Sequence, residues 1–342
     1  MKNLCAIILI SFFILTNAEA QEVFRVMFYN TENFFDTKDA PDKADEEFLP
    51  DGVRHWTYGR YLNKRNNLAK VITSIGEWDY PALAGMCEVE NDSVLEDLVK
   101  YSPIRKAGYR YVITESPDSR GIDVALLYQR DRFKYLSHQA YRIVFPYNPT
   151  RTTRDLLYVT GIVATGDTLD VFVCHFPSRR GGEAESEPDR EFAASLLRSK
   201  CDSLRQVRTQ ANIVIMGDFN DEPSNRSIRE TLKALPLEQN IEPQNLYNLF
   251  ADFEKRRNTG SYKFGSQWNM LDQIIVSGNL LLESSRIRAL PHTATIFSRK
   301  FMTVEDKANG GIRPRKTYHG FRHEGGFSDH FPVFVDFEVN TK

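Results

Sequence analysis

The feature that most constrains this chain is a series of short, apolar, β-prone runs that each end in polar side chains. Such runs occupy residues 23–29, 83–87, 171–174 and 214–217, and a glycine-rich run at 325–327 precedes the last polar group. Short apolar runs bounded by turn residues are typical of buried strands. The polar residues that follow these runs are Asn30, Glu32, Glu88, His175, Asp218, Asn220, Asp329 and His330. Because strand ends along one sheet edge often carry functional groups, the pattern predicts a polar site there.

Strand-like and helix-like segments alternate along the chain. Strands are predicted over residues 23–29, 82–89, 109–113, 122–128, 156–163, 169–176, 212–216, 271–276 and 331–337. Apolar residues at helical spacing predict helices over 58–75 and 187–208. An acidic segment at 36–51 and a basic segment at 298–328 are expected to be long loops, which are often functional in compact domains. Because no repeat or Pro/Gly/Ser-rich linker interrupts residues 21–342, they are expected to form one domain.

The N-terminus has the features of a signal peptide. Lys2 provides a positive charge, residues 4–15 are apolar except for one serine, and Ala18-Glu19-Ala20 forms a small-residue cleavage site. Residues 1–20 are therefore expected to be removed, with Gln21 as the first mature residue and a periplasmic or extracellular destination. The apolar run is too short to span a bilayer comfortably, so no stable membrane anchor is expected.

Charge and cysteine content narrow the possible functions. The formal net charge of −2 excludes a global basic field of the kind found in strong non-specific DNA-binding proteins, so any contact with a polyanion must be local. Removal of the signal peptide would leave Cys87, Cys174 and Cys201, and this odd number argues against a disulfide framework. We expect these residues to be buried free thiols. The oligomeric state is not indicated by the sequence, and a monomer is the default expectation.

The polar residues at the strand ends indicate a metal site. Carboxylates at buried strand ends lose hydration and repel one another unless a cation neutralises them. The candidate donors are oxygen atoms of Asn30, Glu32, Glu88, Asp218, Asn220 and Asp329. Hard oxygen donors favour Mg²⁺, with Mn²⁺ or Ca²⁺ as alternatives, over Zn²⁺. The two histidines are too few and too scattered for a zinc motif, and the number of metal ions stays open.

The motifs taken together resemble a known superfamily. They are Tyr29-Asn30-Thr31-Glu32-Asn33, Cys87-Glu88-Val89, and the segments 120–126, 174–179, 217–220, 271–274 and 328–333. In this order, over nearly the whole mature chain, they resemble the endonuclease/exonuclease/phosphatase superfamily. That superfamily contains pancreatic-type deoxyribonucleases, abasic-site endonucleases, sphingomyelinases and inositol-polyphosphate phosphatases. The resemblance implies an α/β fold: a four-layer αββα sandwich of two packed mixed β-sheets flanked by helices.

The resemblance also implies a set of metal ligands. Glu88 resembles the principal metal ligand of the superfamily, with Asn30, Glu32 and Asp329 close by. Glu32 could instead be an ordinary loop carboxylate, because the neighbouring asparagine competes as the polar group. Asp123, in the segment 120–126, could equally be structural.

Four further residues resemble the chemical machinery of the superfamily. Asp218 and Asn220 resemble the pair that orients or activates the nucleophile and binds the phosphoryl oxygens. His330 resembles the catalytic histidine and Asp272 its orienting carboxylate, a pairing that raises imidazole basicity and selects the tautomer. Either Asp218 or His330 could take the proton of the attacking water, and the sequence does not distinguish them.

A second histidine and three arginines complete the predicted site. His175 matches the second histidine of the deoxyribonuclease branch, and Glu115 resembles the carboxylate that holds it. Arg154 resembles a phosphate-contacting arginine. Arg120 and Arg179 are candidates for the same task, with solvated surface charges as the alternative interpretation.

The expected activity is divalent-metal-dependent hydrolysis of a phosphate ester by in-line attack of water. A nuclease is one hypothesis, because the basic segment 298–328 could follow a nucleic-acid backbone and His175 with Glu115 favours the deoxyribonuclease branch. A phosphatase or phosphodiesterase acting on inositol phosphates or lipid head groups fits the near-neutral charge at least as well. A binding module that has lost the chemistry is the third hypothesis, although the set of acidic and histidine positions is intact.

Overall fold

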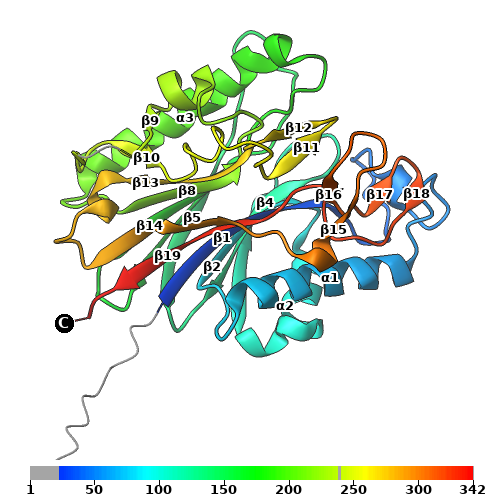
Figure 1. The fold of residues 1–342 in the computed structure, drawn as a ribbon, viewed down its shortest axis with the longest axis horizontal. Helices are drawn as coiled ribbons and strands as arrows, with labels where there is room; N and C mark the ends of the chain where they lie inside the picture. Colours follow the sequence, from blue (N-terminus) through cyan, green and yellow to red (C-terminus); the bar gives the residue numbers. More distant parts are fainter. Residues whose placement is uncertain (1–22, 238–239, 342) are drawn as a thin grey trace, which may run out of the picture.

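Two mixed β-sheets pack face to face between layers of helices in the computed structural model (Figure 1). The structure describes residues 23–237 and 240–341. The predicted signal peptide and mature start lie outside these residues. The first sheet has the order β14 (Ile287–Ile296), β19 (Val333–Val339), β1 (Val23–Phe34), β2 (Leu83–Val89), β4 (Asp123–Gln129), β3 (Tyr109–Ile113). The second has the order β5 (Phe133–Tyr141), β6 (Leu156–Val163), β7 (Thr168–His175), β8 (Ile213–Asp218), β13 (Asp272–Ser277), β10 (Leu246–Asn248), β9 (Ala234–Leu235).

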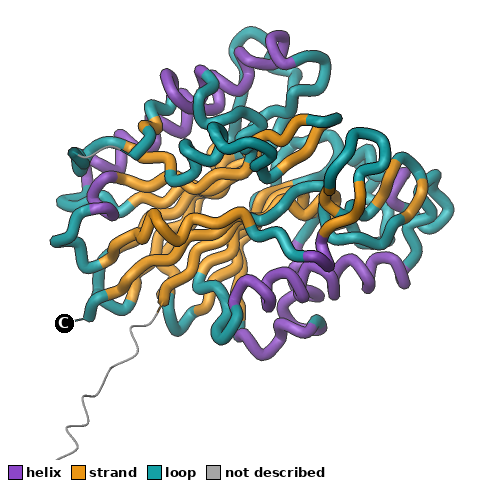
Figure 2. The backbone as a smooth tube through the Cα atoms, in the orientation of Figure 1, coloured by secondary structure: helices purple, strands orange, loops and turns teal. Residues whose placement is uncertain are grey.

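Within the part of the chain that the structure describes, three α-helices cover the outer faces of the sheets, and Figure 2 shows where helices and strands lie. Helices α1 (Tyr58–Gly76) and α2 (Asp92–Tyr101) pack on the first sheet, and α3 (Glu183–Val207) packs on the second. The order of layers is therefore helix, sheet, sheet, helix, which confirms the predicted four-layer sandwich.

Because side chains alternate between the two faces of a β-strand, one strand contributes to two hydrophobic cores. One core lies between the sheets, and the other lies between the first sheet and helices α1 and α2. Along β1, Val26 and Phe28 face the other sheet, whereas Met27 and Tyr29 pack against the layer that contains α1 and α2. Successive side chains of a strand point to opposite faces, so a strand covered on both faces is apolar at every position. The continuous apolar runs in the sequence follow directly from this double burial.

The elements that sequence inspection missed are those without such a run. Strands β5 and β14 lie at sheet edges and are only partly buried, so their sequences are mixed. Helix α2 is short, and Asn91 caps it by accepting a hydrogen bond from the amide of Val94 at 3.1 Å. The segment 298–328 is not a plain loop, because two small hairpins form within it. They are β15 (Thr303–Glu305) with β16 (Ile312–Pro314), and β17 (Tyr318–His319) with β18 (Arg322–His323).

Gly85 in β2 sets how closely the two sheets approach. A Cβ atom added there would lie 2.4 Å from Sδ of the buried Met216 in β8. We expect Gly85→Ala to lower the free energy of unfolding by about 1–3 kcal/mol, the usual effect of overpacking a core. Urea denaturation would measure this change. Gly59→Ala is the control, since an added Cβ in that exposed first turn of α1 would meet its nearest atom only at 4.0 Å. Equal stabilities of the two variants would contradict the prediction.

Candidate active site

The sheet topology brings the predicted residues to one edge of the sandwich. The neighbours β1 and β2 run parallel, as do β7 and β8, so each pair ends at the same edge. Asn30 pairs in register with Cys87, and His175 pairs with Asp218. Strand β13 runs antiparallel to β8 and begins at Asp272, directly opposite Asp218. The C-terminal ends of β1, β2, β7 and β8 and the N-terminal end of β13 therefore lie at the same edge of the sandwich.

Three of the predicted residues have an unusual backbone conformation. Glu32, Glu88 and Asn220 have φ values of 52°, 58° and 50°, in the left-handed region that non-glycine residues seldom adopt. The ladder register also shifts between Asn30 and Phe34 and again around Glu88. Such shifts re-aim a side chain out of its strand, and strained backbone of this kind is concentrated at functional sites. The local backbone thus turns these polar side chains away from the two cores.

Asp218 lies at the centre of the site. Its Oδ2 accepts a hydrogen bond from Nδ2 of Asn30 at 3.0 Å, and its Oδ1 accepts one from the amide of Asn220 at 2.9 Å. The Nε2 atoms of His175 and His330 lie 3.7 Å and 3.8 Å from the same Oδ2. Burial raises the pKa of Asp218, an effect that the nearby His330 opposes. Asn30 and Asn220 therefore fix a carboxylate between two imidazoles.

His330 and Asp272 form the expected pair. Nδ1 of His330 lies 2.6 Å from Oδ2 of Asp272. Burial alone would lower the histidine's pKa, but Asp272 and Asp218 raise the pKa of His330 to about 10. Tyr262 stacks obliquely on the imidazole, with ring centroids 4.7 Å apart. The arrangement leaves Nε2 of His330 directed at Asp218 as a charged donor.

His175 differs from His330 in its surroundings. Burial, and then the charges of Arg154 and Arg120, hold the pKa of His175 well below its usual range, so the ring is neutral. Its Nδ1 has no hydrogen-bond partner among the described residues. The structure does not place Glu115, the carboxylate predicted to hold this histidine, in contact with it. Glu115 is exposed, in the segment after β3, and its backbone carbonyl accepts from Arg142, while Asp218 is the carboxylate beside His175.

The remaining carboxylates have an oxygen-rich arrangement suited to a hard cation. Oε2 of Glu88 accepts the amide of Asn33 at 2.9 Å, and its Oε1 lies 3.8 Å from Arg120. Burial raises the pKa of Glu88, and Asp329 raises it further. Glu32 does not line the cleft, and its Oε2 accepts a hydrogen bond from the backbone amide of Thr317 at 2.6 Å. Mutual repulsion among buried carboxylates is the condition that a bound divalent cation relieves.

The site opens into a cleft of about 900 Å³. Its lining includes the predicted residues Asn30, Glu88, Arg120, Arg154, His175, Arg179, Asp218, Asn220, Asp329 and His330. Arg154 is buried and lies 3.3 Å from Asp118, while Arg120 is more exposed and faces Glu88. Arg179 donates through Nε to the carbonyl of Asn220 at 2.7 Å, so it is no simple surface charge.

Asp123 does not line the cleft. Its carboxylate accepts hydrogen bonds from the Thr114 hydroxyl and the Ser116 amide, which supports its interpretation as a structural residue.

Two charged residues that support the site were not predicted from the sequence. Lys64, on α1, is buried and donates to Thr317 Oγ1 at 2.6 Å, with Glu32 3.8 Å away. Arg190, on α3, is fully buried with its Nε 2.7 Å from Oδ1 of Asp221, the residue after Asn220. Both are charged residues on amphipathic helices, where exposure is the default expectation. Their burial, which only the structure shows, distinguishes these two residues from ordinary solvent-exposed charges on a helix.

The Arg190–Asp221 pair supports the turn that presents Asn220. We expect Arg190→Met to lower the free energy of unfolding by about 3–5 kcal/mol, because Asp221 would become a buried charge without its main partner. Thermal and urea denaturation would measure the loss. Arg198→Met is the control, since Arg198 pairs with the partly exposed Asp202 on the same helix and such pairs contribute about 0–1 kcal/mol. If both variants lost the same stability, the special role of Arg190 would be excluded.

A cleft with carboxylates, a histidine–aspartate pair and arginines offers groups that phosphoester hydrolysis requires: ligands for a cation and donors to the phosphoryl oxygens. The sequence matches the Endonuclease/Exonuclease/phosphatase family over residues 25–339. The chain belongs to this family and is a phosphoesterase of its type. No protein of curated function matches the sequence. Among the described residues, no helix has the length and apolar character needed to cross a membrane.

Solved structures share the fold at low sequence identity. An endonuclease/exonuclease/phosphatase family protein from Bacteroides thetaiotaomicron is 16% identical with a TM-score of 0.58, and the match covers 94% of this chain and 99% of that one. A mannosyl-6-phosphatase from the same organism is 17% identical with a TM-score of 0.56, covering 92% and 99%. D. rerio TDP2 in complex with a single-strand DNA product is 12% identical with a TM-score of 0.55, also covering 92% and 99%. At these identities the likeness shows the shared fold.

Proposed function

We propose that this protein is an exported, divalent-metal-dependent phosphodiesterase of the nuclease type. The observation that carries the proposal is the meeting of Glu88, Asp218 and His330 in one arginine-lined cleft, although they lie far apart in the sequence. Features of residues 1–20 support export. The oxygen donors of Asn30, Glu88 and Asp329 support Mg²⁺, with Mn²⁺ or Ca²⁺ as substitutes. Glu32 would bind such an ion only by turning its second oxygen towards the cleft.

The residues of the cleft divide the chemical tasks. When bound beside Glu88, a hard divalent ion would polarise the phosphoryl oxygens and stabilise the leaving oxygen. Asp218, oriented by Asn30 and Asn220, accepts the proton of the attacking water. His330, held by Asp272 through Nδ1, lines the cleft and would stabilise the charge that develops on a phosphoryl group bound there.

His175 and the arginines complete the anion site. His175 lines the cleft as a neutral ring and can donate one hydrogen bond to a phosphoryl oxygen. Arg120 and Arg154 contribute positive charge on the Glu88 side of the cleft, and Arg179 lies by Asn220. Charge-assisted hydrogen bonds of this kind are stronger than neutral ones and favour a phosphate over other esters.

The rim of the cleft favours a nucleic-acid strand over a small monoester. Arg151, Arg179 and Arg180 line the cleft in addition to the arginines near Glu88. Arg151 pairs with Asp189 and Arg179 pairs with Asp221, so the exposed Arg180 supplies the charge beyond what one phosphate requires. Phe264 also lines the cleft and is 73% exposed, at the end of β11 (Tyr262–Phe264), before the turn to β12 (Gln267–Asn269). An exposed aromatic ring beside a basic groove is the usual platform on which a nucleobase stacks.

Phosphomonoester hydrolysis is the second candidate function. A mannosyl-6-phosphatase shares the fold, and the cleft volume of about 900 Å³ falls within the range of small-molecule sites. The basic segment 298–328 was expected to bind the phosphate backbone of a nucleic acid. The structure gives weaker support for this role than the net charge of the segment implied. Three of its cations already pair with carboxylates: Arg313 and Arg322 with Glu324 at 2.8 Å and 3.0 Å, and Lys316 with Asp329 at 3.9 Å.

A substrate panel decides between these functions. The mature protein, with Mg²⁺, Mn²⁺ or Ca²⁺, is assayed on plasmid DNA, RNA, a single-stranded oligonucleotide, a bis-aryl phosphodiester, sphingomyelin and sugar and inositol phosphomonoesters. We expect diester cleavage of nucleic acid that weakens with salt. Release of inorganic phosphate from monoesters alone would favour the second candidate.

Phe264→Ala tests the proposed base-stacking platform. We expect KM for an oligonucleotide to rise about 10-fold, in line with about 1–3 kcal/mol for one stacked base, while KM for the bis-aryl diester changes little. Phe321→Ala is the matched control, because Phe321 is 70% exposed but does not line the cleft. Equal KM changes in the two variants would count against nucleic acid as the substrate.

A further inference from the structure

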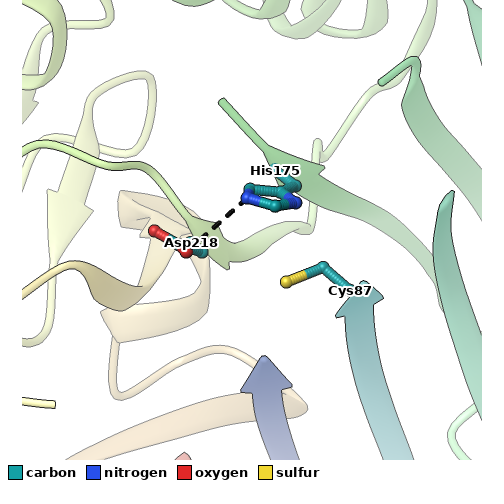
Figure 3. Close-up of side chains that lie close together, drawn as sticks. All are labelled: Cys87, His175 and Asp218. Atoms are coloured by element: carbon teal, nitrogen blue, oxygen red, sulfur yellow. Dashed lines mark ion pairs between the residues drawn. The ribbon is translucent and has the colours of Figure 1, made fainter. Parts of the chain in front are cut away.

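A group of three potential metal ligands adjoins the proposed magnesium ligands, because Cys87 precedes Glu88 and Asp218 accepts a hydrogen bond from Asn30. Cys87 near the end of β2, His175 at the end of β7 and Asp218 at the end of β8 have side chains that lie close together (Figure 3). The sulfur, nitrogen and oxygen atoms all lie within 4.8 Å of one another. All three residues are at least 97% buried. The three strands belong to two different sheets, so the sandwich itself holds the trio together.

The ligand types differ from those of the magnesium site. Thiolate, imidazole and carboxylate are the set that Zn²⁺ prefers in tetrahedral coordination, whereas Mg²⁺ prefers oxygen alone. Three protein ligands with an open fourth position are the usual composition of an accessible zinc site. His175 and Asp218 line the cleft, which provides both the route of entry and the open position.

His175 is also free of competing partners. Its Nδ1 has no hydrogen bond among the described residues, and its Nε2 faces only Asp218, at 3.7 Å. His330, by contrast, is already bonded through Nδ1 to Asp272 at 2.6 Å. A neutral imidazole without a fixed partner is the form that binds a metal ion. The second compact trio, Asp218 with Asp272 and His330, lacks a soft ligand and belongs to the proposed catalytic machinery.

We propose that Cys87, His175 and Asp218 form an inhibitory site for a thiophilic divalent cation such as Zn²⁺. Binding transfers the thiol proton of Cys87 to solvent and forms sulfur, nitrogen and oxygen bonds to the ion, with no change of oxidation state. The bound ion removes Asp218 and His175 from the phosphoryl group, so hydrolysis stops even when Mg²⁺ is in excess. The inhibitory effect rests on the proposed function, whereas the binding itself does not.

Co²⁺ spectroscopy tests the binding without any enzymatic assay. Co²⁺ added to the mature protein in excess Mg²⁺ should produce a sulfur-to-cobalt charge-transfer band in the near ultraviolet. Cys87→Ser, a nearly isosteric change, should abolish the band, and Cys87→Ala should do the same if serine perturbs folding. Cys201→Ser is the control, because Cys201 is buried in α3, in the core on the outer side of the second sheet. No band in the wild-type protein, or a band that persists without Cys87, would overturn the site.

Zn²⁺ titration then measures affinity and inhibition. By calorimetry, Cys87→Ser should weaken Zn²⁺ binding by more than about 100-fold, since loss of even an outer-shell partner costs 10- to 100-fold. The Zn²⁺ concentration that halves each variant's own Mg²⁺-supported rate should rise by at least 10-fold in Cys87→Ser and stay constant in Cys201→Ser. An unchanged value in Cys87→Ser would refute inhibition through this trio. If the protein hydrolysed no phosphate ester, the cobalt band would still report metal binding at this site. Failure of the proposed hydrolase function and failure of the proposed metal site are therefore distinguishable.

Discussion

Replacing His330 with glutamine should lower kcat by about 10²- to 10⁴-fold, the usual contribution of a positioned acid–base group. The variant loses the positive Nε2 donor that lies 3.8 Å from Asp218 and the bond to Asp272. KM should change little, because the interaction strengthens as charge develops on the phosphoryl oxygens. Steady-state kinetics on the best substrate of the panel would measure both constants.

His292→Gln is the matched control for this experiment. His292 is an exposed histidine on the edge strand β14 and does not line the cleft. Its replacement should leave kcat unchanged. Melting temperatures of both variants would separate lost chemistry from lost folding. A folded His330→Gln protein with near-full activity would remove His330 from the mechanism.

Glu88→Gln should have the second large effect, on metal binding. The change keeps the side-chain shape and the contact with the Asn33 amide but removes the negative charge beside Asp329. We expect at least a 10-fold weaker Mg²⁺ affinity by calorimetry and a rate lower by about 10²-fold at saturating Mg²⁺, typical of losing one electrostatic stabiliser. Removal of metal with EDTA should abolish wild-type activity, and added Mg²⁺ or Mn²⁺ should restore it.

Glu96→Gln provides the comparison for Glu88. Glu96 pairs with Lys100 on the surface of α2, so its neutralisation removes a solvated charge and nothing near the cleft. Mg²⁺ affinity and rate should both stay at wild-type values. Activity that survives EDTA in the wild-type protein would contradict metal dependence, and unchanged Mg²⁺ affinity in Glu88→Gln would move the metal elsewhere.

The two variants examine separate parts of one electrostatic arrangement. Burial raises the pKa of Glu88, and the charges of Asp329 and Asp218 raise it further, while His330 lowers the pKa of both Glu88 and Asp218. Groups coupled in this way give non-additive effects. The double variant Glu88→Gln with His330→Gln should therefore lose less than the product of the two single losses.

The sequence by itself determined the layers of the fold. Strands buried on both faces must be apolar at every position, so β1, β2, β7 and β8 were visible as runs, and polar residues beyond their ends marked the site. Motif order then implied the superfamily, and the four-layer sandwich is confirmed. The edge strands β5 and β14 are only partly buried and leave no such pattern, which is why they were missed. Helix α2 was missed because it spans only 10 residues, although it buries Val94, Leu95, Leu98 and Val99 at helical spacing.

Only the tertiary structure decided which side chains meet. Glu115 and Asp218 were both carboxylates after a strand, yet one is exposed and the other lies between two histidines. Arg190 reads as a surface charge on a helix until its burial against Asp221 is known. Local sequence specifies whether a residue belongs to a strand or helix, because that depends on near neighbours. Contacts between strand ends depend on sheet order and register, which are set by pairing between segments far apart in the chain.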